Sequence, residues 1–269
     1  MGVTKPLSLT QHDARTIEEE TNGMDEARRL ERAARTAWPP EEEIGDDGWA
    51  LRFNQDVTHR GNSVLAVERP RGDLEARIDR AERFYRERGL GACFQVTPFS
   101  RPEGLDAALE RRGYRIESPS EVWLRPHAEP WPGPGGAAVE ARTRAWPDWT
   151  GAALADDDEA AVRRATLDRI AVPARFALAR SGGEALGAGY AVLAEGSVGV
   201  FGMHVRTEAR GRGIGGAILA DLLAWGREAG ARDGFLLVES GNAPAQALYR
   251  RAGFGFLHPY WYRRQGTED

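Results

Sequence analysis

Apolar residues in the second half of the chain recur alternately at the spacing of strands and at the spacing of helices. The expected strands cover 138–143, 174–179, 185–194, 198–205, 235–239 and 256–263. Helical spacing is found at 147–170, where an acidic run interrupts it, and again at 214–229 and 243–252. The resulting order, β-α-α-β-β-β-α-β-α-β, predicts an α/β domain with a mixed sheet.

The first half alternates in the same way but less regularly. Its expected helices cover 24–37, 73–88 and 103–112, and its expected strands cover 48–53, 63–67, 92–97 and 116–124, the last interrupted by Pro119. Arg125–Gly136 then contains four prolines and three glycines, a composition that predicts a semi-rigid linker. We therefore divide the chain into four parts: a polar tail or extra helix at 1–22, a first domain at 23–125, a linker at 126–136 and a second domain at 137–269.

The two halves also resemble each other at an offset of 141 residues. Aligned in this way are Arg69–Gly72 with Arg210–Gly213, Gly89 with Gly230, Phe94 with Phe235 and, after a shift of one residue, Gly113 with Gly253. This agreement predicts an internal duplication. The alternative is that any two strand–helix–strand units share glycine stops.

Composition narrows the class of protein. With 41% hydrophobic and 29% charged residues over 269 positions, the chain is typical of a soluble globular protein with length for a substantial core. A net charge of −5 gives no basic field for nucleic acid, and no apolar run approaches the ~20 residues of a membrane span. The single cysteine, Cys93, excludes an internal disulfide and favours the cytoplasm. The five histidines show no metal-ligand spacing.

The most informative stretch is a turn rich in arginine and glycine that leads directly into a helix pattern. It consists of Arg210, Gly211, Arg212, Gly213, Ile214, Gly215 and Gly216. Such a turn directs several backbone N–H groups to one point at the positive end of the helix dipole, where a phosphate or pyrophosphate binds. The glycines also match a dinucleotide fingerprint, but residues 206–210 separate them from the strand, and too little chain follows Glu239 to complete that fold.

This stretch resembles the GCN5-related N-acetyltransferases (GNATs). The family's acetyl-CoA motif is Arg/Gln-x-x-Gly-x-Gly/Ala, followed by an asparagine and, seven residues later, a tyrosine. The matching residues here are Arg210, Gly213, Gly215, Asn242 and Tyr249. The resemblance is close over 198–254, and the element order extends it to about 138–263. It implies a GNAT fold, with a mixed, centrally splayed sheet flanked by helices, and, through the duplication, two GNAT-like domains in tandem.

The resemblance also implies a role for each part of the site. The amides of the turn would bind the pyrophosphate of acetyl-CoA, and the strand edge at Met203, His204 and Val205 would hold its pantetheine. Asn242 would contact the pantetheine or cap the next helix. Tyr249 would protonate the departing CoA thiolate, unless it is an aromatic residue packed on the helix's apolar face. Since a tyrosine has an ordinary pKa of ~10 and a thiol one of ~8.5, the proton is available at neutral pH.

The general base is the least defined position. Leu237 stands where one subgroup of the family carries a carboxylate, so we take Glu239, on the same face of the strand, as the first candidate. His204 is the second candidate, and deprotonation through water is the third. The implied reaction is direct acetyl transfer to a primary amine of a small-molecule or peptide acceptor. The alternatives are a different acyl-CoA, or a non-catalytic module that binds acyl-CoA. Either a monomer or a homodimer fits.

The first half departs from the family's motif at several corresponding positions, although Arg69 and Gly72 align with Arg210 and Gly213. Pro70 lacks an N–H, Leu74 replaces a glycine, Leu109 aligns with Tyr249, and Pro102 lies near the position of Asn242. We expect this half to have no cofactor site, to pack on the second half and to wall the acceptor pocket.

Overall fold

A computed structural model describes residues 11–68, 71–126, 133, 137–154 and 157–266, with only the backbone described for 11–22. The helices are α1 (Gln11–Ala37), α2 (Leu74–Arg86), α3 (Leu105–Arg111), α4 (Pro147–Ala153), α5 (Ala160–Asp168), α6 (Ile214–Glu228) and α7 (Ala243–Arg251). The strands of the first half are β1 (Glu42–Asp46), β2 (Trp49–Phe53), β3 (Val64–Ala66), β4 (Cys93–Val96) and β5 (Arg115–Pro126). Those of the second half are β6 (Ala138–Arg142), β7 (Ala174–Ser181), β8 (Glu184–Ala194), β9 (Ser197–Val205), β10 (Asp233–Glu239) and β11 (Gly255–Arg264).

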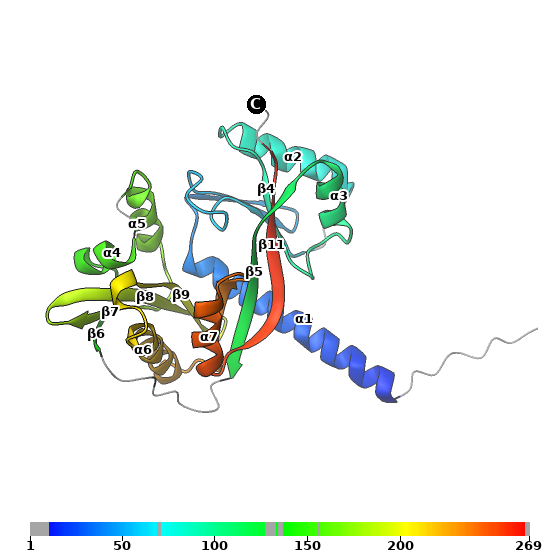
Figure 1. Cartoon of the computed structure of the whole chain (residues 1–269). Helices are drawn as coiled ribbons and strands as arrows, with labels where there is room; N and C mark the ends of the chain where they lie inside the picture. The colour runs from blue at the N-terminus through cyan, green and yellow to red at the C-terminus, as the bar shows by residue number, and fades with distance from the viewer. Residues whose placement is uncertain (1–10, 69–70, 127–132, 134–136, 155–156, 267–269) are drawn as a thin grey trace, which may run out of the picture.

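All eleven strands form one mixed sheet, in the order β1-β2-β3-β4-β11-β5-β10-β9-β8-β7-β6. The two halves exchange their last strands. β5 lies antiparallel between β10 and β11, and β11 lies antiparallel between β4 and β5, as Figure 1 shows for the two long central strands. Each half therefore completes its part of the sheet with a strand of the other half.

The expected element order of the second half is confirmed, and that of the first half is confirmed apart from one additional strand; the mixed sheet and the tandem arrangement are confirmed too. Matched glycines of the duplication share the left-handed backbone that only glycine adopts without strain: Gly89 and Gly230 have φ of 75° and 85°, and Gly113 and Gly253 have φ of 82° and 85°. The division at 126–136 stays a prediction, because most of that linker lies outside the described residues and the sheet continues across it.

Two elements differ from the sequence prediction. Helix α1 begins at Gln11, so the predicted tail is helical from there, and 1–10 lie outside the described residues. Strand β1 was not predicted, because the segment Glu-Glu-Ile-Gly-Asp forms an exposed edge strand without apolar alternation. The predicted interruption at Pro119 is a bulge inside a continuous strand: Tyr260 pairs with Ser120, whereas Tyr262 pairs with Glu117.

Helices cover both faces of the sheet. On one face α6 and α7 pack over the strands of the second half, around Leu222, Leu236 and Tyr249. On the other face α1 covers the centre of the sheet through Leu30 and Ala34. The first half has its own core under α2 and α3, which includes the aromatic residues Trp49, Phe84, Tyr85 and Phe94. Trp123 of β5 is also buried, but in the core of the second half.

Candidate active site

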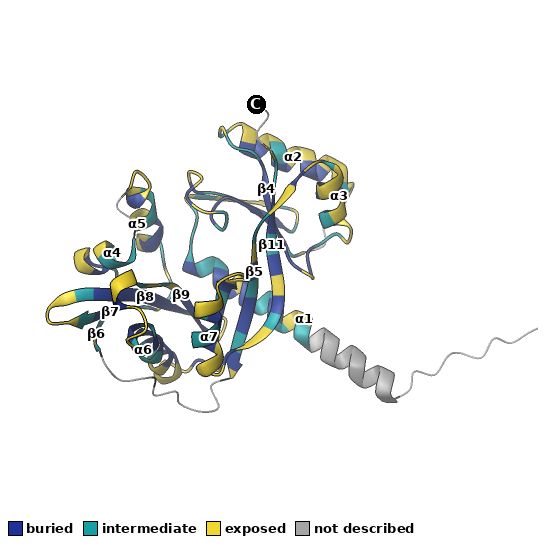
Figure 2. Ribbon diagram, in the orientation of Figure 1, coloured by how far each residue is buried: buried dark blue, intermediate teal, exposed yellow. Residues whose placement is uncertain are grey.

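The glycine-rich turn offers free backbone donors at the start of α6. Gly211 and Gly213 have φ of 75° and 79°, which turns the chain sharply into the helix. No described residue accepts a hydrogen bond from a backbone N–H between Gly211 and Gly216. The first part of the turn, Arg210 to Arg212, is exposed, as the yellow segment that leads into α6 shows in Figure 2, whereas Ile214 and Gly216 are buried. These donors at a helix N-terminus form a binding site for a phosphate group.

Arginine side chains add positive charge to the turn. The Nε of Arg210 donates to the carbonyl oxygen of Val205 at 3.2 Å, which ties the turn to the end of β9. Arg212 is exposed and forms no ion pair with any described residue, whereas Arg206 is neutralised by Glu184 and Glu208. Two guanidinium groups therefore stand free of acidic partners beside the free N–H groups.

Next to the turn, the parallel strands β9 and β10 separate. Their ladder ends at the pair Val200–Leu236, although β9 continues to Val205 and β10 to Glu239. A bulge at Gly202 accompanies the separation. Its φ is 59°, and a Cβ there would lie 2.9 Å from the ring of Tyr190, so a glycine is required. Beyond this pair no ladder joins β9 to β10 among the described residues, so this edge of β9 can pair with an extended ligand.

The bulge decides where the predicted pantetheine-binding residues face. Met203 and Val205 pack against the core beneath α6. His204 is exposed and lines a different cavity, of about 650 Å³, together with Asp148, Arg180 and other residues near α4. The second candidate for the general base thus lies apart from the cavity that contains the first.

Tyr249 lies in α7, on the sheet face that α6 and α7 cover. It is 7% exposed, and its ring meets that of Phe254 edge-on at 6.1 Å between centroids. Burial raises the pKa of Tyr249 to about 12. Its hydroxyl makes no hydrogen bond to any residue that the structure describes. The side chain is therefore both a packed aromatic residue and a phenol that keeps its proton at neutral pH.

Asn242 caps α7. Its Oδ1 accepts the backbone N–H of Ala245 at 3.2 Å, and Pro244 occupies the first turn of the helix. The sequence left two roles open for this residue, and the capping geometry is present. An exposed asparagine in this position keeps its NH₂ group available to a ligand.

Glu239 lies at the end of β10 and lines a cavity of about 320 Å³ on the sheet face that α1 covers. The same cavity is lined by Phe201 and Gly202 of β9, so it opens at the separation of the strands. Glu239 and Tyr249 therefore lie on opposite faces of the sheet, Glu239 on the face that α1 covers and Tyr249 on the face that α6 and α7 cover.

The first half supplies much of this cavity, and whether it walls an acceptor site stays a prediction. Thr58, His59 and Arg60 come from the loop after β2, and Ser118 and Ser120 come from β5. None of these residues belongs to a recognisable sequence motif. They could not be assigned to the site from the sequence, because they reach it only through the contact between the two halves.

The loop after β2 is held by hydrogen bonds within itself and by hydrogen bonds to residues of the second half. The Oδ1 of Asn62 accepts the backbone N–H of Asn54 at 2.7 Å and that of Asp56 at 3.0 Å. From α5 and the residue after it, Thr166 and Arg169 hydrogen-bond the side-chain amide of Asn54 at 3.0 and 2.6 Å. This part of the cavity wall is therefore held in a defined position.

At the equivalent of the turn, the first half carries a different helix start. The carboxylate of Asp73 accepts the backbone N–H of Ala76 at 2.9 Å, so a side chain occupies the place of a bound anion. Leu109, which aligns with Tyr249, is fully buried. Pro70 lies outside the described residues.

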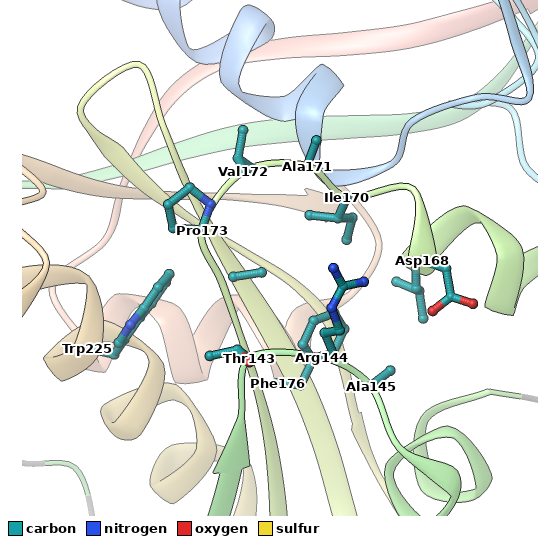
Figure 3. Close-up of a pocket in the computed structure, with 12 residues that line it drawn as sticks. Thr143, Arg144, Ala145, Asp168, Ile170, Ala171, Val172, Pro173, Phe176 and Trp225 are labelled. Carbon is teal, nitrogen blue, oxygen red and sulfur yellow. The ribbon is translucent and has the colours of Figure 1, made fainter.

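Another cavity, of about 510 Å³, lies at the far edge of the second half, where Trp225, Pro173, Arg144 and Asp168 surround it (Figure 3). Trp225 follows Ile214 by eleven residues, about 16 Å along the axis of α6. This cavity is therefore separate from the turn and from the strand gap.

Within the described ranges, no cluster of three His, Cys, Asp or Glu side chains is placed to hold a metal ion. Nor does that part of the chain contain a helix with the length and apolar character needed to cross a membrane.

In sequence, the chain matches an acetyltransferase family and a protein named as an N-acetyltransferase. Residues 25–263 match the family model described as "Probable histone acetyltransferase Rv0428c C-terminal". A protein of Bacillus subtilis (strain 168) named "Uncharacterized N-acetyltransferase YobR" is 28% identical over 260 residues, which cover 89% of this chain and 99% of that protein.

Solved structures show the same fold. A GCN5-related N-acetyltransferase from Kribbella flavida superposes with a TM-score of 0.66 at 16% identity, over 90% of this chain and 96% of its own. A tandem GNAT protein from the clavulanic acid biosynthesis pathway superposes with a TM-score of 0.56 at 15% identity, over 72% of this chain and 70% of its own.

Proposed function

The chain belongs to the acetyltransferase family of the Rv0428c C-terminal region, within the GNATs, and from this premise we propose that it transfers the acetyl group of acetyl-CoA to a primary amine. The observation that carries the proposal is the continuity of the free N–H groups at the start of α6 with the unpaired edge of β9. A molecule with a pyrophosphate at one end and an extended amide chain at the other matches both features. We place the reaction in the cytoplasm, which suits a single buried thiol.

In the proposed binding mode, Gly211 to Gly216 hold the pyrophosphate, and Arg210 and Arg212 add charge. The backbone of Met203 to Val205 pairs with the pantetheine, and Asn242 lies beside it. The thioester carbonyl then lies in the gap, where backbone N–H groups of β9 stabilise the negative charge that develops on its oxygen.

The amine reaches this carbonyl from the cavity lined by Glu239. A nitrogen–carbon bond forms while the carbon–sulfur bond breaks, and the thiolate takes the proton of the Tyr249 hydroxyl. Glu239 accepts the proton that the amine loses. Direct transfer is favoured over an acyl-enzyme, because Cys93 is fully buried in the first half and burial raises its pKa to about 12.

The cavity of about 320 Å³ is at the small end of the range for small-molecule sites, so it favours a small amine or the end of a peptide over a folded protein surface. Two alternatives use the same turn: an enzyme with a different acyl donor, and a module that binds acyl-CoA without turnover. The test below distinguishes both from an acetyltransferase.

The test is a thermal melt with and without acetyl-CoA, using the wild type, Gly215→Glu and Ala224→Glu. At a hundredfold excess over its dissociation constant, a ligand of the folded state stabilises by about 2.7 kcal/mol. We expect this gain in the wild type and its loss in Gly215→Glu, because a carboxylate at the first turn of α6 repels phosphate. A Cβ at position 215 meets only ordinary contacts, at 3.4 Å from Leu248 and 3.6 Å from Val205.

Ala224→Glu is the matched control. It places the same charge on an exposed position of the same helix, distant from the turn, and we expect it to keep the gain. A wild type without any gain, or a gain that persists in Gly215→Glu, rejects the proposed site. With binding established, mass spectrometry of amines incubated with acetyl-, propionyl- and succinyl-CoA identifies the donor. Binding without product from any of the three favours the non-catalytic module.

A further inference from the structure

The cavity beside Glu239 has an aromatic wall and a cationic end. The aromatic residues that line it are Trp38, Tyr190, Phe201, Tyr260 and Tyr262. They come from both halves, and Tyr190 is fixed by a hydrogen bond from its hydroxyl to the carbonyl oxygen of Ala37 at 2.9 Å. Such a wall holds the flat or apolar body of a small molecule.

Arg60 forms the cationic end. Its Nη2 donates to the hydroxyl of Tyr260 at 3.0 Å, and its guanidinium lies 5.7 Å from the centre of that ring. Among the described residues no carboxylate lies within 4.0 Å of Arg60, so its remaining N–H donors have no acidic partner. The side chain is thus positioned by a neutral group and keeps donors for a ligand.

The charges beneath the cavity do not balance. Arg52 is 1% exposed, and it donates to the side chains of Ser63 and Gln95 rather than to an acid. Glu31, 3% exposed, is the buried carboxylate whose charge acts on both Arg52 and Arg60. Two guanidinium groups therefore share this one buried carboxylate, and among the described residues Arg60 has no carboxylate in direct contact with it.

The other ionisable groups at the rim do not supply the missing negative charge. Asp56 pairs with Arg264 at 2.9 Å, and Glu117, 41% exposed, lies 3.2 Å from His59. Burial lowers the pKa of His59, so this ring is neutral at pH 7 and adds no further cation. An anionic ligand group on Arg60 would restore the balance.

Glu239 and the cationic end lie in one row across the sheet. Glu239 pairs with Ser120 of β5, and Ser120 pairs with Tyr260 of β11, whose hydroxyl holds Arg60. Two strand spacings place the backbones of Glu239 and Tyr260 about 10 Å apart. A molecule lying along this row therefore has its two ends at groups of opposite charge.

We propose that the acceptor is a small amine with an apolar or aromatic body and an anionic group at the opposite end, bound by Arg60. The amine lies toward Glu239 and the strand gap. The anionic group is a carboxylate or a phosphate ester, both of which match the guanidinium fork. This proposal rests on the proposed function, because it assigns the cavity to the acceptor.

The test measures binding and not turnover. The probes are 4-(aminomethyl)benzoate, 4-(aminomethyl)benzylphosphonate and the uncharged 4-(aminomethyl)benzamide, titrated by calorimetry into the full-length protein with and without CoA. We expect at least one anionic probe to bind about tenfold or more tightly than the amide, the effect of hydrogen bonds to a charged group. The better of the two anions identifies carboxylate or phosphate as the recognised group.

Three variants assign the preference to Arg60. In Arg60→Met we expect the dissociation constants of all probes to lie within about twofold of each other. Arg86→Met, which removes an exposed charge from α2, is expected to keep the wild-type preference for the anionic probes. Tyr260→Phe keeps the ring but removes the hydroxyl that positions the guanidinium of Arg60. We expect this variant to fold and to show a smaller difference in affinity between the anionic probes and the amide. A wild type that does not prefer an anion, or a preference that survives in Arg60→Met, overturns the proposal.

Failure of the proposed function gives a different result. In that case acetyl-CoA causes no stabilisation and no amine is acetylated, while the anion preference of the cavity is still present in the calorimetry. If acetyl transfer occurs but charged and uncharged amines bind and react equally, the proposed function stands and the anion-binding role of Arg60 is rejected.

Discussion

Tyr249 combines two properties that a sequence pattern leaves as alternatives. Its ring belongs to the core under α6 and α7, and its hydroxyl is free of hydrogen bonds to the described residues. Burial keeps the phenol neutral, because the phenolate would lose its hydration. Packing therefore produces a phenol that stays neutral, a property that the proposed proton donor needs.

For Tyr249→Phe we expect kcat to fall about 10²-fold or more, the range for loss of a general acid, with the dissociation constant of acetyl-CoA little changed. Steady-state kinetics and a thermal melt of the same samples check this. A kcat within a few-fold of wild type would leave Tyr249 only its packing role. Tyr114→Phe, also buried but in the separate core of the first half, is the control for loss of a hydroxyl.

The raised pKa also predicts a pH dependence. With a folded pKa of about 12, above the ordinary 10, Tyr249 stays protonated through neutral and mildly alkaline pH, so it causes no loss of kcat below about pH 10. Its stabilising contribution is complete below pH 10 and is lost as the pH rises toward 12, because the unfolded state ionises first. Chemical denaturation at pH 8, 10 and 11 should show this fall in the free energy of unfolding.

Strand β5 joins the two halves. By sequence it ends the first half, yet it pairs along its length with β10 and β11 and places Trp123 in the core of the second half. The guanidinium of Arg250, from α7, lies 4.9 Å from the centre of the Trp123 ring. The helix that carries Tyr249 therefore rests on a residue of the other half.

We expect Trp123→Ala to lower the free energy of unfolding by about 3–5 kcal/mol, as for other large aromatic residues removed from a core. Hydrogen exchange should show the lost protection in β10 and α6, although the substitution lies in the first half. Ile116→Ala, on the same strand but 53% exposed, should change stability by no more than about 0.5 kcal/mol. Protection lost only in residues 42–114 would contradict the assignment of β5 to the second half.

The molecule as a whole is held together by a sheet without an interruption. Besides the exchanged strands, Arg29 of α1 contacts Asp233 of β10 at 2.9 Å, and the loop after β2 contacts α5. The candidate acceptor cavity lies between the halves, so their relative position is part of the site.

We therefore expect a single heat-unfolding transition for the full chain, with the calorimetric enthalpy equal to the van't Hoff enthalpy. An exchanged strand cannot leave one half without opening the other, and this couples the two. Scanning calorimetry with and without acetyl-CoA should move the whole transition. Two separated transitions, of which acetyl-CoA moves only one, would show that the halves unfold independently.

The sequence by itself determined the element order, the duplication and the turn before α6. These depend on local rules, namely apolar periodicity, the left-handed glycines and the Arg-x-x-Gly-x-Gly spacing, which act over a few residues at a time. The loss of the motif in the first half can also be read from a few neighbouring residues. In the structure the carboxylate of Asp73 caps the start of α2, where the second half has its glycine-rich turn.

Only the tertiary structure decided the rest. The strand exchange and the cavity that joins Arg60 to Glu239 depend on residues more than a hundred positions apart. The bulge at Gly202 depends on how β9 pairs with β8 and on the position of the ring of Tyr190. The apolar pattern of β5 fits either half equally well, because a buried central strand shows the same residues whichever partners it has. Which neighbours it joins is settled by the packing of the whole sheet, and that choice brings the residues of the candidate acceptor site together.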